Sequence, residues 1–340
     1  MSYKQTKVWN VDNNDIEKGE PLLLQEPTMW IRDNKLIAFP TETVYGLGAN
    51  ALSDEAVSKI FYAKGRPSDN PLIVHIGDKT QLNELVADIP EVADRLMEPF
   101  GPGALTLIFK AKPVLSTHVT AGLETVGIRM PSNPVARAFL KACQLPIAAP
   151  SANQSGRPSP TTAAHVLQDL NGRIDGVIDG GQTGIGLEST VLSIVEDTPV
   201  LYRPGGVTKE EIEGVVGPIG VDKALVSTNE QPKSPGMKYT HYAPEADVYI
   251  VEEPKHFHSA IQRAKASGLR VGVLASESYK EAHESIVVHS LYDLAQTFYY
   301  TLRLFDEKAV TVIFVEAVPT LGVGAAIMNR LEKAAGGKRL

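Results

Sequence analysis

Short apolar runs of strand length alternate with helix-like segments along most of the chain. The amphipathic stretch Asp54–Ala63 predicts a helix that begins after Ser53 as its N-cap. The same patterns predict strands at 36–39, Leu72–Ile76, Ala104–Phe109, Val126–Met130, Pro146–Ala149, Val177–Asp179, Val191–Val195 and Val200–Tyr202, and helices at Val135–Ala142 and Thr161–Leu170. Several of these strands are too close in sequence for a crossover helix, so we expect an α/β fold whose sheet is not purely parallel.

The periodicity stops near Gly214 and returns after residue 246. The intervening 214–246 is rich in Gly, Pro, Ser and Thr, which is typical of a linker. The last block predicts strands at Val248–Val251, Val271–Ala275 and Val312–Val315, and helices at Phe257–Ala266, Leu291–Phe305 and Gly324–Ala335. Successive β-α units indicate a smaller Rossmann-like domain with a doubly wound parallel sheet. The predicted organisation is therefore a first domain at 1–213, a linker at 214–246 and a second domain at 247–340.

Composition narrows the class of protein. The 340 residues favour two domains, and 43% hydrophobic with 21% charged residues is typical of a folded soluble chain. The net charge of −7 disfavours a protein that holds nucleic acid mainly through backbone electrostatics. The single cysteine, Cys143, excludes an intrachain disulfide and a Cys-based zinc cluster. The sequence has neither a signal-peptide pattern nor 18 consecutive apolar residues, so we expect a cytoplasmic protein without a membrane segment.

Four basic side chains lie in or beside the loops of the first block: Lys64, Arg66, Arg129 and Arg203. In an acidic protein, such a local reversal of charge indicates a pocket for a small anion, with phosphate as the first candidate. The alternative is that each is a solvated surface charge.

Sequence motifs for other chemistries are weak. The chain has no GxxxxGK[ST], which disfavours a Walker-type NTPase, and neither HExxH nor GxSxG. Gly46-Leu-Gly48-Ala-Asn-Ala51 fits GxGxx[GA], but the predicted strand ends some six residues earlier. A dinucleotide fingerprint needs these glycines at the strand-to-helix turn, so we interpret them as a turn that permits positive φ.

The loop sequences, taken together, carry a specific resemblance. PTETVYGLG, KGRPSDNPL, GPGALTLI, VGIRMP, APSAN, GLESTV and YRPGG follow one another in the order seen in the YrdC-like family. SPGMKYTHYAP followed by an α/β domain resembles the longer, two-domain form of that family, the L-threonylcarbamoyladenylate synthases. The resemblance implies a YrdC-like α/β first domain with a twisted mixed sheet and a concave pocket.

The reaction that this resemblance implies is a nucleotidyl transfer. L-threonine, bicarbonate or CO2, and ATP give L-threonylcarbamoyl-AMP and pyrophosphate, for N6-threonylcarbamoyladenosine formation at tRNA position 37. A separate complex transfers the threonylcarbamoyl group to tRNA, and transient contact with it is expected. Mg2+ carried by ATP would share the phosphate charge, which agrees with the lack of a dedicated metal motif.

Residue roles also follow from the resemblance. Lys64, Arg66, Ser151 and Asn153 resemble the signature tetrad around the ATP phosphates and are the candidate catalytic residues. The further ATP contacts implied are Asn70, Thr125, Ser159, Arg203 and Tyr242, and the L-threonine contacts are Thr43, His75, Arg129, Ala149 (through its backbone) and Ser189. Arg129 suits the amino-acid carboxylate because its forked donors bind both oxygens. By pattern alone His75 is a core histidine, and only the resemblance makes it a ligand.

Alternatives stay open at this point. A carbamoyltransferase of the hydrogenase-maturation type makes a carbamoyl adenylate with a similar domain, but it is longer and has cysteine-rich zinc modules. An RNA-binding module with a local basic surface is the second alternative. The segment around Lys238, Tyr239, His241 and Tyr242 is interpreted as a lid that excludes water from the carbamate, the alternative being a passive connector.

Overall fold

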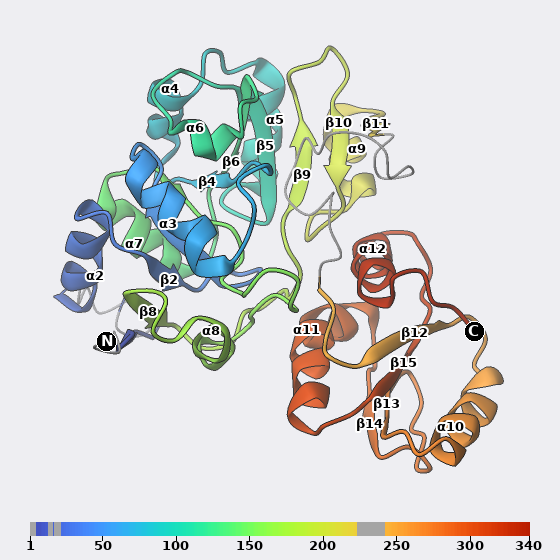
Figure 1. Ribbon diagram of the computed structural model, residues 1–340. Coiled ribbons are helices and arrows are strands. Elements are labelled where there is room, and N and C mark those ends of the chain that lie inside the picture. Colours follow the sequence, from blue (N-terminus) through green and yellow to red (C-terminus); the bar gives the residue numbers. More distant parts are fainter. Residues whose placement is uncertain (1–4, 13–15, 17–21, 223–241) are drawn as a thin grey trace. The chain divides into compact units, whose positions relative to one another are not determined.

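The computed structural model describes residues 5–12, 16, 22–222 and 242–340 (Figure 1). The chain divides into two compact units, each of which makes most of its contacts within itself. The first unit comprises Met1–Ser155, Pro160–Gly184 and Glu188–Lys238, and the second comprises Gly156–Ser159, Ile185–Leu187 and Tyr239–Leu340. Helix α9 (Lys209–Val216) runs through Gly214, at which we placed the start of the linker, and 223–241 of that linker lie outside the described residues.

The first unit is built on an 11-stranded mixed sheet with the order β1-β8-β2-β3-β7-β4-β6-β5-β9-β10-β11. Its strands are β1 (Lys7–Asn10), β2 (Ile37–Phe39), β3 (Gly46–Asn50), β4 (Ile73–His75), β5 (Leu105–Lys110), β6 (Thr125–Arg129), β7 (Ile147–Ala148), β8 (Gly176–Asp179), β9 (Thr190–Ser193), β10 (Val200–Arg203) and β11 (Gly220–Val221). Parallel and antiparallel pairs both occur, for example β4 with β6 and β5 with β6. The predicted mixed sheet is confirmed.

Eight α-helices and one 3-10 turn accompany this sheet in the part of the unit that the structure describes. They are α2 (Leu22–Arg32), α3 (Asp54–Lys64), η1 (Lys79–Gln81), α4 (Leu82–Leu85), α5 (Glu91–Phe100), α6 (Thr117–Thr120), α7 (Pro134–Cys143), α8 (Ala163–Leu170) and α9, with a single helical residue at 16. The side chain of Ser53 accepts a hydrogen bond from the backbone N–H of Ala56, which confirms the predicted N-cap of α3.

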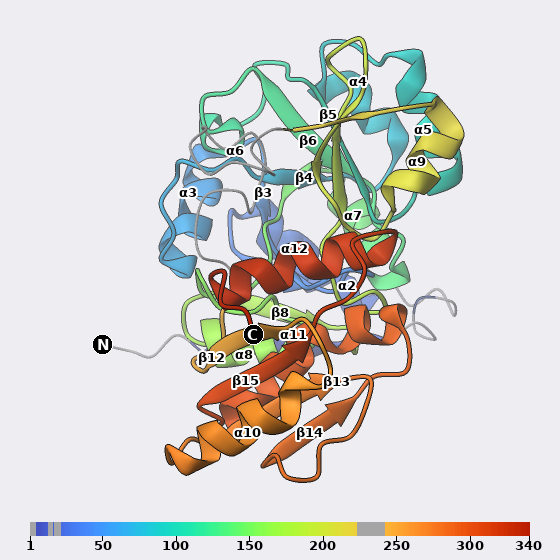
Figure 2. The same ribbon diagram turned by 90° about the vertical axis from the view of Figure 1, so that its right-hand side faces the viewer.

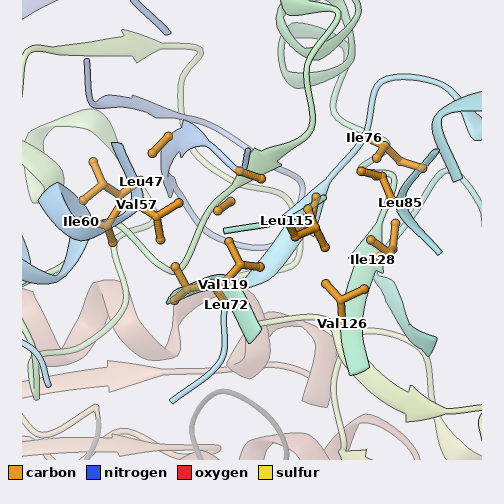
Figure 3. Packing of buried hydrophobic residues seen from close by; sticks show 14 of the residues in the cluster. Leu47, Val57, Ile60, Leu72, Ile76, Leu85, Leu115, Val119, Val126 and Ile128 are labelled. Atoms are coloured by element: carbon orange, nitrogen blue, oxygen red, sulfur yellow. The ribbon is translucent and has the colours of Figure 1, made fainter. Parts of the chain in front are cut away.

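Two hydrophobic cores lie on opposite faces of the sheet, because successive side chains of a strand point to opposite sides. In β2, Ala38 belongs to one core, and Ile37 and Phe39 belong to the other. The first core takes in residues of α3, α5 and α8, and the second takes in residues of α2 and α7. Figure 3 shows part of the first core, in which Val57 and Ile60 of α3 lie beside Leu47 of β3.

One prediction for this unit is wrong. Gly46 and Gly48 lie in strand β3, not in a turn, and neither has a positive φ. A Cβ atom on Gly48 would come within 3.0 Å of the Ile37 carbonyl oxygen and of side-chain atoms of Ile147 and Phe39. The glycine therefore serves close packing within the sheet, a role that the sequence pattern does not distinguish from a turn.

The second unit has a four-stranded sheet with the order β12-β15-β13-β14, and every pair in it is parallel. Its elements are β12 (Asp247–Val251), α10 (His256–Ala266), β13 (Val271–Ala275), β14 (Glu284–Val287), α11 (Leu291–Glu307), β15 (Val312–Glu316) and α12 (Val323–Ala335) (Figure 2). Val271 and Val273 pack with α10 on one face, while Gly272 between them faces Phe305 of α11. Helices thus cover both faces, and the predicted doubly wound parallel sheet is confirmed.

Two short segments that interrupt the first unit in the sequence belong to the second unit. The guanidinium of Arg303 in α11 donates from Nη2 to the carbonyl of Pro158 at 2.5 Å, and the N–H of Ala243 donates to the carbonyl of Gly156 at 3.0 Å. A Cβ atom on Gly186 would lie only 2.5 Å from the carbonyl oxygen of Ala295. Gly156–Ser159 and Ile185–Leu187 are therefore held by contacts that the sequence pattern does not reveal.

We expect Gly48→Ala to destabilise the first unit by ~1–3 kcal/mol, because the added methyl group meets three neighbours at once, one of them a backbone carbonyl. Gly214→Ala is the matched control: it lies inside α9 with nothing within 4 Å of its Cβ position, so it should stabilise by ~0.5–1 kcal/mol. Urea unfolding followed by circular dichroism measures both changes. Equal stability of the two variants would contradict the packing role of Gly48.

Candidate active site

Three members of the predicted phosphate-binding tetrad meet at the end of α3. The ammonium of Lys64 donates to the carbonyl oxygens of Ser151 at 2.5 Å and Asn153 at 2.6 Å, with Asn153 Oδ1 at 3.3 Å. The Ser151 hydroxyl donates to the same Oδ1 at 2.5 Å. Lys64 is 2% exposed, so its charge is held inside the unit by a loop whose two carbonyls face it. The loop 149–153 and α3 thus form one hydrogen-bonded group.

The other tetrad member, Arg66, follows Gly65, which ends α3 in the left-handed conformation at φ 62°. Arg66 Nη2 lies 3.4 Å from the carbonyl oxygen of Asn70, which is a long hydrogen bond. The N–H of Ser155 donates to the Lys64 carbonyl at 2.9 Å. This hydrogen bond joins the end of α3 to the segment that follows Asn153.

The predicted threonine contacts gather through strand register. His75 in β4 is paired with Arg129 in β6, and Arg129 is paired in turn with Thr106 in β5. Residues directly opposite each other in a sheet lie on the same face. The hydroxyls of Thr106 and Ser189 are 2.8 Å apart, which extends this row toward β9. His75, Arg129 and Ser189 are thereby brought into one line across the sheet.

Arg129 is 5% exposed and has partners on all three nitrogens. Nε donates to the Gly103 carbonyl at 3.1 Å, Nη1 to the Thr43 hydroxyl at 2.9 Å, and Nη2 to Glu42 Oε1 at 2.6 Å. A guanidinium has five N–H donors, so within the described residues two remain, one on each terminal nitrogen. These two donors leave Arg129 with capacity for a further acceptor.

His75 is buried, and its Nδ1 has no hydrogen-bond partner among the described residues. Burial first, and then the positive charge of Arg129, lower the pKa of His75 to about 3. The imidazole is therefore neutral at physiological pH. An unsatisfied polar atom inside a core is costly, which makes this position a candidate for a ligand contact.

Ser189 is fixed from the side of β10. Arg203 is 4% exposed and donates from Nε and Nη2 to the Ser189 carbonyl at 3.1 and 2.9 Å, and from Nη2 to its hydroxyl at 3.2 Å. A Cβ atom on Gly205 would lie 2.2 Å from the backbone nitrogen of Thr190. The YRPGG segment consequently packs directly on the backbone that carries Ser189, and only glycine fits there.

Tyr45 joins the loops that carry these groups. Its hydroxyl donates to the Gly181 carbonyl at 2.7 Å, its N–H donates to the Pro160 carbonyl, and its own carbonyl accepts from Ala152 N–H. Burial, reinforced by the charge of Asp179, raises the pKa of the Tyr45 phenol, so it acts as a permanent donor. Sequence analysis missed this residue, along with Glu42, Thr106 and Gly205.

Comparison with known proteins decides the family. Residues 29–205 match the family model for Sua5, YciO and YrdC, described as telomere recombination, and 207–336 match the model for the threonylcarbamoyl-AMP synthase C-terminal domain. The chain belongs to the Sua5/YciO/YrdC family.

Full-length relatives share this architecture. The threonylcarbamoyl-AMP synthase of Bacillus subtilis is 56% identical, with 98% of this chain and 99% of that protein covered. The one from Pyrococcus abyssi is 48% identical, with 90% and 92% covered. A crystal structure of Pyrococcus abyssi Sua5 complexed with L-threonine superposes with a TM-score of 0.95 at 45% identity, covering 98% of this chain and 99% of that one.

The remaining residues implied by the family resemblance lie apart from these two groups or in the other unit. Thr125 begins β6, at the opposite end from Arg129, so the strand's length separates them. Ser159 and Tyr242 belong to the second unit, where the Tyr242 ring lies 5.3 Å from that of Tyr299. Ala149 is buried directly after β7, and its N–H donates to the Ile73 carbonyl at 2.9 Å.

Two kinds of feature are absent from the described residues. None of the helices there is long and apolar enough to cross a membrane. That part of the chain also holds no cluster of three or more His, Cys, Asp or Glu side chains suited to a metal ion. Of the predicted lid, Lys238, Tyr239 and His241 lie outside the described residues.

We expect His75 to stay neutral down to about pH 4, since its pKa is lowered to about 3. At a pH between the usual pKa of histidine and the lowered pKa of His75, unfolding takes up a proton. The free energy of unfolding therefore falls as pH falls, with a slope of up to ~1.4 kcal/mol per pH unit. Above the usual pKa of histidine, the contribution of His75 to the free energy of unfolding is fully present. Imidazole nitrogen shifts measured by NMR during a pH titration check the protonation state directly.

His75→Asn tests the prediction for stability. In this variant the fall in the free energy of unfolding that comes from protonation of residue 75 should be lost. His118→Gln, at a half-buried position of the same unit, should keep it. Protonation of the His75 ring near pH 6.5 would contradict the burial argument.

Proposed function

We propose that this protein synthesises L-threonylcarbamoyl-AMP from L-threonine, bicarbonate or CO2, and ATP, and releases pyrophosphate. The observation that carries the proposal is the Arg129 site, in which a buried guanidinium keeps two donors for a carboxylate beside the neutral, unpartnered nitrogen of His75. The names of the Bacillus subtilis and Pyrococcus abyssi relatives, and the L-threonine bound to the latter's Sua5, support the choice of amino acid.

The chemistry needs two bond-forming steps. The threonine amine attacks the carbon of CO2 and loses a proton, which gives a carbamate. With bicarbonate the same carbamate forms and water leaves. A carbamate oxygen then attacks the α-phosphorus of ATP, the bond between that phosphorus and the bridging oxygen breaks, and pyrophosphate leaves. Neither step requires a covalent bond to the protein, so positioning and stabilisation of phosphate charge can supply the acceleration.

The two groups of the site divide these tasks in the proposal. The row of His75, Arg129 and Ser189 holds the amino acid, with Thr43 and the Ala149 backbone beside it. Lys64, Arg66, Ser151 and Asn153 bind the phosphates, and Asn70, Thr125, Ser159, Arg203 and Tyr242 are the further ATP contacts. Mg2+ would arrive with ATP and neutralise part of the phosphate charge.

The cellular role follows from the product in the same proposal. The threonylcarbamoyl group is destined for adenosine 37 of tRNA in the cytoplasm, through transient contact with a separate transfer complex. The decisive experiment is an assay of pyrophosphate release. Release that requires threonine and bicarbonate together supports the synthase, whereas release that is independent of threonine contradicts it.

We expect Lys64→Ala to reduce turnover by roughly 30- to 1000-fold, because a phosphate contact in a water-poor site stabilises the transition state by ~2–4 kcal/mol. Lys59→Ala is the matched control on the same helix: its side chain is 42% exposed and its ammonium pairs with Glu55 at 2.6 Å. Pyrophosphate release at saturating ATP measures both. Near-normal turnover of Lys64→Ala would remove Lys64 from the phosphate site.

Arg129→Lys should raise the KM for L-threonine by about 10- to 100-fold and leave the KM for ATP within about twofold. A single ammonium cannot bind both carboxylate oxygens and also keep the contacts to Gly103 and Thr43. Arg173→Lys, at an exposed position of the same unit, should change neither constant. Equal losses for both substrates would assign Arg129 to the nucleotide or to folding.

A further inference from the structure

Glu42 is a carboxylate in the candidate site that stands in the PTETVYGLG motif but was assigned no role there. It lies in the loop between β2 and β3, and its side chain is 12% exposed, against 4% for that of Arg129. Oε1 accepts from Arg129 Nη2 at 2.6 Å, and Oε2 accepts from the backbone N–H of Ser132 at 3.1 Å. One carboxylate therefore holds both the guanidinium and the turn that follows β6.

The loop that carries Glu42 is itself held in place. The Thr41 hydroxyl donates to the Val44 carbonyl at 2.7 Å, lies 2.8 Å from the Thr43 hydroxyl and accepts from the backbone N–H of Thr43 at 3.2 Å. Thr43 in turn accepts from Arg129 Nη1. Glu42 and Thr43 thus each accept a hydrogen bond from one of the two terminal nitrogens of the guanidinium. Because the guanidinium is planar, these two bonds fix both its position and its orientation.

We propose that Glu42 is a positioning residue for the amino-acid substrate: it stays bonded to Arg129 while the substrate carboxylate takes the remaining N–H donors. Arg129 then bridges two carboxylates, one from the protein and one from the ligand. The inference rests on the proposed function. The opposite arrangement, in which Glu42 occupies the substrate's place and must be displaced, requires Glu42 to leave both Arg129 and Ser132 N–H.

The two arrangements predict opposite effects of a Glu42 substitution on the affinity for L-threonine. If Glu42 positions Arg129, Glu42→Gln should weaken L-threonine binding about tenfold, since a charge-assisted hydrogen bond becomes a neutral one. The KM for ATP should stay within about twofold. Glu42→Asp keeps the charge but is one methylene shorter, so its threonine affinity should lie between those of Glu42→Gln and the unaltered protein.

The measurement is calorimetric binding of L-threonine to the full chain, with KM values for threonine and ATP from pyrophosphate release. Glu55→Gln is the control, because Glu55 is 67% exposed and pairs with Lys59 on α3, and its threonine affinity should not change. If the unaltered protein binds no threonine, the proposed function fails. If it binds threonine and Glu42→Gln binds as tightly or more tightly, the positioning role of Glu42 is overturned.

A folding control completes the test. Thermal unfolding without ligand shows whether Glu42→Gln retains its structure. If it does not, Glu42→Asp decides: weaker threonine binding with an unchanged KM for ATP supports the role, and unchanged threonine binding overturns it.

Discussion

The guanidinium of Arg129 is 5% exposed, and a charge at that depth has to be compensated by partners with good geometry. Those partners come from three places in the sequence: Glu42 and Thr43 before β3, Gly103 before β5, and Ser132 through its bond to Glu42. The backbone N–H of Gly103 also donates to the Met130 carbonyl. Satisfying one buried cation thereby fixes the loops that surround the carboxyl end of β6.

The same cation sets the state of its neighbour. His75 is paired with Arg129 in the register of β4 and β6, and both the burial and the nearby positive charge oppose its protonation. A neutral imidazole can accept or donate one hydrogen bond on either nitrogen, depending on its tautomer, whereas an imidazolium only donates. The sheet register thus places a fixed cation and a neutral polar group side by side.

Sequence reasoning was most successful where the signal is local. The N-cap Ser53 and the helix after it, the mixed sheet and the parallel β-α units all follow from patterns within a few residues or from strand spacing. It was wrong for Gly48 because a glycine that packs a strand and one that makes a turn look alike without the facing residues. Glu42 and Thr106 were missed because their partners, Arg129 and Ser189, are more than eighty residues away.

Two cations of the site are held in different ways, and the difference bears on what each does. Arg129 pairs with a carboxylate, which cancels most of its long-range electric field. Its main effect is therefore to orient the groups that it contacts. Lys64 donates to the carbonyl oxygens of Ser151 and Asn153 and to the Asn153 side-chain amide oxygen, which are neutral acceptors. The acceptors of the two cations therefore differ: neutral oxygens at the end of α3, and a carboxylate with a hydroxyl and a carbonyl on the row across β4, β6 and β5.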